Sequence, residues 1–131
     1  MGKYVVDTSV MLQMLQEGIE VPSGHQLLAP TLIRSQVLDA LYHAVHVGEL
    51  PEKAGLGRLA KFSEMKIRFL GDKVLRRTAW TIAKELGWGS THYAEYIALT
   101  QLQADALVTP DADLASAASE FVSTTTLESL L

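Results

Sequence analysis

Three aspartates occupy positions from which their carboxylates could meet. The run before Asp7, Lys-Tyr-Val-Val, is β-branched and aromatic and predicts a buried strand. Asp111 and Asp113 follow a second such run at residues 106–109. Parallel strands of an α/β sheet place their carboxyl ends, and hence their ligands, at one edge. If both strands are central, we expect these three carboxylates to face a common pocket.

The chemistry of such a cluster is that of a divalent-metal site. Carboxylates that lack Lys or Arg partners repel one another, and a bound cation relieves that repulsion. Mg²⁺ and Mn²⁺ prefer oxygen ligands and can activate water for attack on a phosphodiester. The sequence therefore predicts Mg²⁺ or Mn²⁺ held by Asp7, Asp111 and Asp113. The plainer alternative is that Asp7 only caps the next helix, a role that Thr8 and Ser9 could also fill.

Alternating strand and helix patterns predict the elements that would position these acids. Expected strands cover residues 3–6, 26–29, 65–70, 106–109 and 121–123. Expected helices cover residues 9–17, 30–47, 51–62, 72–86, 90–102 and 110–118, with a helical tail after the last strand. This order is typical of a three-layer α/β/α sandwich around a mostly parallel sheet. We expect one domain over residues 1–131, because no linker interrupts the pattern.

Composition limits the class of protein. The chain has 131 residues, 48% of them hydrophobic, which is enough for a compact core. It has no cysteine, so disulfides and thiolate metal sites are excluded. No secretory leader and no membrane-length apolar run is visible, and we expect a cytoplasmic protein.

Charge is distributed unevenly along the chain. The formal net charge is −4, yet nine of the eleven Lys and Arg residues fall between Lys53 and Lys84, where only two acids occur. That segment therefore has a net charge of +7, and the rest of the chain has a net charge of −11. Solvated helix faces would explain this, and so would a rim that attracts phosphates. The candidate substrate-binding cations are Lys66, Arg68, Arg76 and Arg77. For Trp80 we expect buried packing rather than stacking on a base.

Four segments occur in an order that resembles a known family. They are Val5-Val6-Asp7-Thr8-Ser9, the helix containing Gln36-Val37-Leu38-Asp39-Ala40-Leu41, Tyr93-Ala94-Glu95-Tyr96-Ile97-Ala98-Leu99, and Leu107-Val108-Thr109-Pro110-Asp111-Ala112-Asp113-Leu114. The chain is similar over its whole length to PIN domains, closest to the VapC toxins of toxin–antitoxin pairs. The resemblance implies an Mg²⁺- or Mn²⁺-dependent endoribonuclease, a VapB-like antitoxin partner and a homodimer.

The same resemblance assigns roles to single residues. Asp7 and Asp111 match the family's first and last acids, and Asp113 matches an additional acid. Supporting positions are Thr8, Ser9, Gln36, Asp39, Tyr93 and Thr109.

The sequence departs from the family at two of the four core acids. Gln36 stands where the family has glutamate, and Tyr93 where it has aspartate. Gln keeps an oxygen but no charge, and Tyr is a poor Mg²⁺ ligand. Asp39 and Glu95 are the nearest acids in sequence that could substitute.

Two functions are compatible with this pattern, and a third is disfavoured. The first is a VapC-like ribonuclease with weakened metal affinity. The second is a catalytically impaired PIN-fold module that binds RNA or a protein partner. A flavodoxin-like or phosphoryl-transfer domain is disfavoured, because the residues after Asp7 do not fit the DxDx[TV] pattern.

Overall fold

The protein is a three-layer α/β/α sandwich around a five-stranded parallel sheet. The computed structural model describes residues 2–131. The strands are β1 (Lys3–Val6), β2 (Gln26–Pro30), β3 (Ile67–Leu70), β4 (Ala106–Val108) and β5 (Thr124–Thr125). Their order in the sheet is β3-β2-β1-β4-β5, with every neighbouring pair parallel. The strands that precede Asp7 and Asp111 are therefore adjacent and central, which was the condition for their carboxylates to share one edge.

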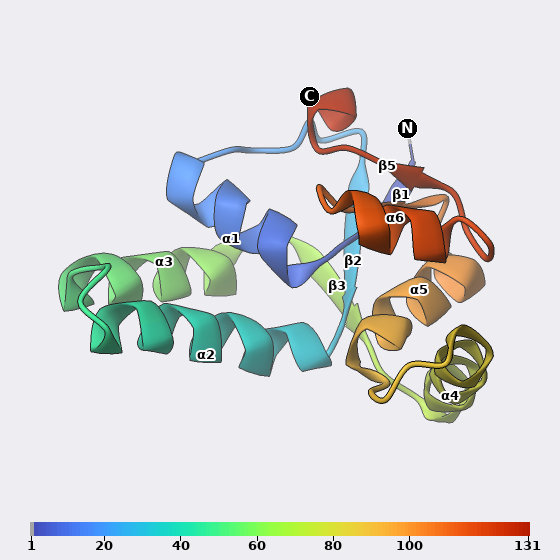
Figure 1. The fold of residues 1–131 in the computed structure, drawn as a ribbon. Coiled ribbons are helices and arrows are strands. Elements are labelled where there is room, and N and C mark those ends of the chain that lie inside the picture. Colours follow the sequence, from blue (N-terminus) through green and yellow to red (C-terminus); the bar gives the residue numbers. More distant parts are fainter. Residues whose placement is uncertain (1) are drawn as a thin grey trace.

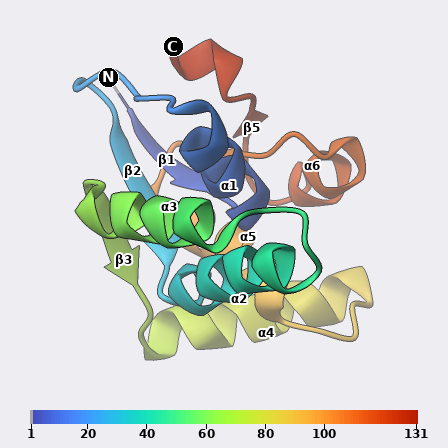
Figure 2. The same ribbon diagram turned by 90° about the vertical axis from the view of Figure 1, so that its left-hand side faces the viewer.

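Helices cover both faces of the sheet. They are α1 (Thr8–Glu17), α2 (Leu32–His46), α3 (Glu52–Glu64), α4 (Lys73–Leu86), α5 (His92–Gln103) and α6 (Ala112–Ala118), followed by the short 3₁₀ helix η1 (Glu128–Leu130). Helices α1, α2 and α3 lie on one side, and α4, α5 and α6 on the other (Figure 1). Helix α4 begins just after β3 and lies at the carboxyl edge of the sheet, packed against α5 (Figure 2).

Local sequence signals account for several helix boundaries. Asp72 caps α4, because its side chain accepts a hydrogen bond from the Leu75 amide, and Gly87 ends that helix in the left-handed conformation with φ 70°. Asp111 caps α6 in the same way as Asp72, through the amides of Asp113 and Leu114. These helices were predicted within one or two residues.

The core lies on both sides of β1, β2 and β4. Val5, Val6, Leu28 and Leu107 are fully buried, as continuous apolar runs in a covered parallel sheet must be. Helix α5 contributes a buried face between β2, β1 and β4. This packing fixes the start of α5 against the carboxyl ends of the central strands.

Three local predictions were wrong. The last strand is Thr124–Thr125 rather than residues 121–123, because Phe121 and Val122 close a turn onto Ala118. Pro30 ends β2 instead of opening α2. Trp80 is 69% exposed rather than buried, since α4 turns Leu75, Ala79 and Ile82 inward.

Candidate functional site at the carboxyl edge of the sheet

Asp7 is the buried carboxylate of the carboxyl edge, with only 3% of its surface exposed. It caps α1: its Oδ1 accepts hydrogen bonds from the Val10 amide at 2.8 Å and from the Ser9 hydroxyl at 2.8 Å. Its Oδ2 accepts one from the Tyr93 hydroxyl at 3.3 Å. The capping role predicted for Asp7 is therefore confirmed, and its second carboxylate oxygen contacts Tyr93 at the carboxyl edge.

Gln36 belongs to a second set of polar contacts, which includes Thr8, the residue that follows Asp7. Its Oε1 accepts a hydrogen bond from the Thr8 hydroxyl at 2.8 Å and another from the Tyr96 hydroxyl. The Thr8 and Tyr96 hydroxyls also lie 2.8 Å apart. The amide oxygen of Gln36 thus accepts hydrogen bonds from two hydroxyl groups of the protein, which use both of its lone pairs.

Two tyrosines of α5 form the wall of the site. Tyr93 and Tyr96 are three residues apart on one helix face, and their rings stack with centroids 5.6 Å apart. Trp88 packs edge-on against Tyr93 at 6.0 Å. Tyr96 is 2% exposed, whereas Tyr93 is half-buried. The aromatic rings occupy space that a shorter acid at position 93 would leave open.

Burial raises the pKa of both tyrosines above the ordinary value of 10.0. For Tyr93 the Thr109 hydroxyl lowers the pKa in part, while the negative charges of Asp7 and Asp111 raise it further. For Tyr96 the contact with Thr8 lowers the pKa, and the charges of Asp7 and Glu95 raise it. Each phenol therefore stays a neutral hydrogen-bond donor in the folded protein.

These shifts predict a loss of stability at alkaline pH. Above about pH 10 the unfolded chain loses the tyrosine protons that the folded chain retains, so the free energy of unfolding falls as pH rises. Urea unfolding from about pH 9 to about pH 11 measures this fall. Tyr93→Phe should make it shallower, whereas Tyr42→Phe should not, because Tyr42 is 66% exposed. If the free energy of unfolding fell equally steeply with pH in both variants, the pH dependence could not be assigned to Tyr93.

The other two predicted metal ligands, Asp111 and Asp113, do not form a metal-binding group with Asp7. Asp111 and Asp113 are exposed, and Asp111 Oδ1 accepts the amide hydrogens of Asp113 and Leu114 at 2.9 and 3.0 Å. The Asp111 amide in turn contacts the buried Thr109 hydroxyl at 3.3 Å. Over residues 2–131 no three His, Asp or Glu side chains are grouped so that they could hold a metal ion. The residues present therefore do not fit a multi-carboxylate metal centre.

Neither of the two acids nearest in sequence restores the missing charges. Asp39 is exposed on the outer face of α2. Glu95 is half-buried; burial raises its pKa, and the positive charges of His92 and Arg76 lower it. Glu95 thus interacts with a cation of α4, Arg76, and in the described part of the chain no metal-binding group of acids includes it.

The candidate substrate-binding cations fall into two groups. Arg76 and Arg77 are exposed on α4, the helix at the carboxyl edge, and Trp80 is exposed one turn further along. Lys66 and Arg68 instead line a separate cavity beside β2 and β3, to which no residue of α4 contributes. Only the first group belongs to the same edge as Asp7.

Tyr96 is the site residue that sequence reasoning missed. Tyr96 was named above only within the segment from Tyr93 to Leu99, with no role assigned to it. In the structure its hydroxyl contacts both Thr8 and Gln36. The spacing of three residues between Tyr93 and Tyr96 on a predicted helix was the available signal, because it places both rings on one face.

The fold is that of PIN-domain, VapC-like proteins. The crystal structure of PAE2754 from Pyrobaculum aerophilum matches with a TM-score of 0.79 and 21% identity, over 98% of this chain and 91% of that one. VapBC2 from Rickettsia felis, bound to a DNA fragment from its promoter, matches with a TM-score of 0.71 and 7% identity, over 95% and 98%. VapBC-1 from nontypeable Haemophilus influenzae matches with a TM-score of 0.61 and 12% identity, over 95% and 97%.

Sequence comparison adds nothing to this structural likeness. No protein-family model and no curated protein matches the sequence. Within residues 2–131 the helices are too short or too polar to cross a membrane. The fold is thus established, and the activity has to be argued from the site.

Proposed function

We propose that the protein is a VapC-like PIN-fold module that binds RNA at the carboxyl edge of its sheet and does not cleave it efficiently. The observation that carries this proposal is that two uncharged side chains, Gln36 and Tyr93, stand where acids were expected and are engaged in hydrogen bonds within the protein. Gln36 is saturated by Thr8 and Tyr96, and the Tyr93 hydroxyl occupies Asp7 Oδ2. Hydroxyl and amide groups can bind phosphate and ribose oxygens, but they hold Mg²⁺ weakly.

Helix α4 supports RNA as the ligand. Its exposed face carries four cations around one exposed indole: Lys73, Arg76, Arg77, Lys84 and Trp80. Arg77 is three residues before Trp80 and Lys84 four after it, so all three share one side of the helix. A basic groove with an aromatic platform is the usual means of holding single-stranded nucleic acid.

A metal-dependent ribonuclease is the second candidate. It is favoured by Asp7 and Asp111, which follow adjacent central strands and both raise the pKa of Tyr93. The cofactor would be Mg²⁺ or Mn²⁺. A VapB-like antitoxin, a homodimer and a cytoplasmic location are proposed for either function, on the likeness to VapBC structures and on the family resemblance.

Binding and cleavage of one labelled RNA distinguish the two candidates. We expect fluorescence anisotropy to show saturable binding of a single-stranded RNA with or without Mg²⁺ and Mn²⁺. Gel analysis of the same samples should show intact RNA at millimolar metal. The Asp7→Asn variant is the control for contaminating nuclease. Cleavage by the wild type that Asp7→Asn abolishes would establish the ribonuclease instead.

A further inference from the structure

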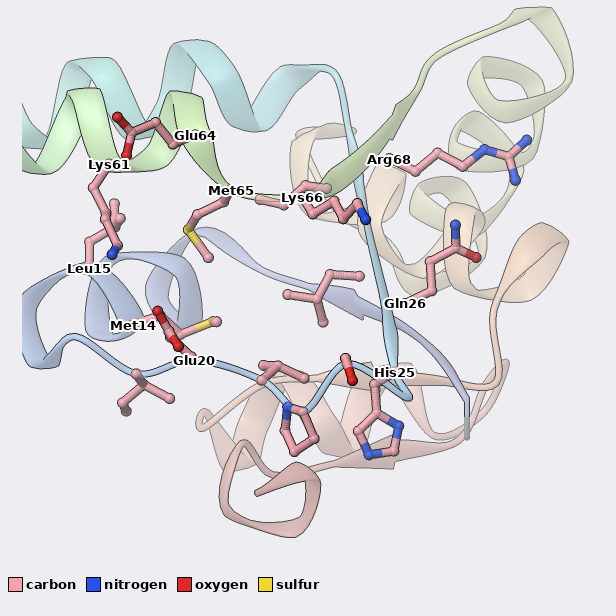
Figure 3. Close-up of a pocket in the computed structure, with 16 residues that line it drawn as sticks. Met14, Leu15, Glu20, His25, Gln26, Lys61, Glu64, Met65, Lys66 and Arg68 are labelled. Atoms are coloured by element: carbon pink, nitrogen blue, oxygen red, sulfur yellow. The ribbon is translucent and has the colours of Figure 1, made fainter.

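A cavity of about 790 Å³ lies away from the Asp7 site and is partly open to solvent. It is lined by the end of α1, the following loop, the start of β2, the end of α3 and the start of β3 (Figure 3). None of the polar residues around Asp7 lines it. The volume is within the range of small-molecule sites.

The floor of this cavity is apolar. Met14, Leu15 and Leu27 line it from α1 and β2 and are at most 8% exposed, while Met65 and Ile67 line it from the other side and are half-buried. Methionine side chains adapt to ligands of different shape because they are unbranched and polarisable. The floor therefore suits a flexible hydrocarbon group.

His25 lines the cavity from the loop before β2. Its Nδ1 is buried and makes no hydrogen bond within the protein. The ring is fixed edge-on against Tyr4, with centroids 5.1 Å apart. Because Nδ1 is inaccessible to solvent, it does not face the cavity, and His25 contributes an aromatic wall rather than a polar group.

Charges around the cavity are separated into two sides. Lys66 and Arg68 lie with His25 and Gln26 on the side of the strands, where β2 and β3 pair in register (Figure 3). Glu20 and Glu64 lie with Lys61 on the side of α1 and α3 (Figure 3). An anion would be attracted to the strand side and repelled by the two acids, so the charges give a bound molecule one orientation.

We propose that this cavity binds a small amphiphilic carboxylate. The carboxylate lies between Lys66 and Arg68, and the hydrocarbon chain lies on the methionine floor. The proposal does not depend on the RNA-binding function, because it rests on different residues.

Decanoate, used below its micellar concentration, tests this proposal. We expect saturable one-site binding by calorimetry, with chemical-shift changes at the methyl groups of Met14 and Met65. Arg68→Glu should weaken binding at least about tenfold, since it reverses an exposed charge at the head-group position. Lys53→Glu is the matched control and should bind like the wild type, because Lys53 is exposed in the first turn of α3, far from the cavity.

Two further comparisons keep the result decisive. Decyltrimethylammonium has the same chain and the opposite charge, and it should not shift the methionine methyl groups. Lys66→Glu reverses the other exposed charge at the head-group position, so it should weaken decanoate binding several-fold even if Arg68→Glu disturbs folding. Equal binding of the two amphiphiles, or no methyl shifts with decanoate, would overturn the proposal.

Discussion

The double variant Gln36→Glu, Tyr93→Asp is expected to cleave RNA at least about 100-fold faster than the wild type in Mg²⁺ or Mn²⁺. Glutamate at position 36 would place a charge where Thr8 and Tyr96 now donate to a neutral oxygen. Aspartate at position 93 would remove the phenol from Asp7 Oδ2 and add a second charge. The two new carboxylates would join Asp7 and Asp111, whose charges both act on position 93 in the wild type, and carboxylate number governs affinity for these cations.

Metal binding provides a readout for this variant that does not need catalysis. Tyr93→Asp loses the stacking on Tyr96 and the edge contact with Trp88, and should lower stability by about 2–4 kcal/mol. Millimolar Mn²⁺ should recover part of that loss in the double variant, because a ligand that binds only the folded state stabilises it. The wild type should show no such metal-dependent rise in Tm.

Adding Asp7→Asn to the double variant is the matched control. It leaves the two new acids in place and removes one charge, and it should abolish both cleavage and the metal-dependent Tm rise. The single variants should each give a much smaller gain, since each leaves one neutral position. A double variant that neither binds Mn²⁺ nor cleaves RNA would show that the loss of two acids is not what limits this site.

The fold could be predicted from the sequence because its signals are local. Val5 and Val6 before Asp7, and Leu107 and Val108 before Thr109, have the composition of buried parallel strands, and they form the central pair of the sheet. Asp72, Gly87 and Asp111 mark helix ends through their own backbone hydrogen bonds and conformations. Such signals depend on a few neighbouring residues, which explains why most element boundaries were correct.

The site was less predictable because it depends on tertiary contacts. That Gln36 and Tyr93 replace acids is visible in the sequence, but the hydrogen bonds that satisfy them join α1, α2 and α5. Lys66 and Arg76 lie in one charged segment, yet the change of direction between β3 and α4 separates them in space. The exposure of Trp80 also depends on which side of α4 packs against α5.

That exposed face of α4 leads to the second large effect. The triple variant Arg76→Ala, Arg77→Ala, Trp80→Ala is expected to bind single-stranded RNA about 100-fold more weakly than the wild type. The loss has two parts with different physical origins. The arginines neutralise phosphates, and the indole stacks on a base, so the two contributions respond differently to salt.

Salt dependence separates these contributions. Removing two phosphate contacts should reduce the slope of log K against log salt by about 1.4, at about 0.7 for each phosphate on a single strand. Trp80→Ala alone should weaken binding about tenfold and leave that slope unchanged, because stacking releases no counterions. Trp80→Phe should restore part of the affinity, since a smaller ring still offers a stacking surface.

The double variant Lys53→Glu, Arg58→Glu is the control for general electrostatics. It changes the net charge by four units on α3, on the opposite side of the sheet from α4. If α4 is the RNA-binding surface, this control should lower affinity less than the neutral Arg76→Ala, Arg77→Ala pair, which changes net charge by only two units. An equal or greater loss in the control would mean that RNA responds to the overall charge of the protein. Retention of wild-type affinity by the triple variant would place the binding surface elsewhere, and the exposed indole would then need another explanation.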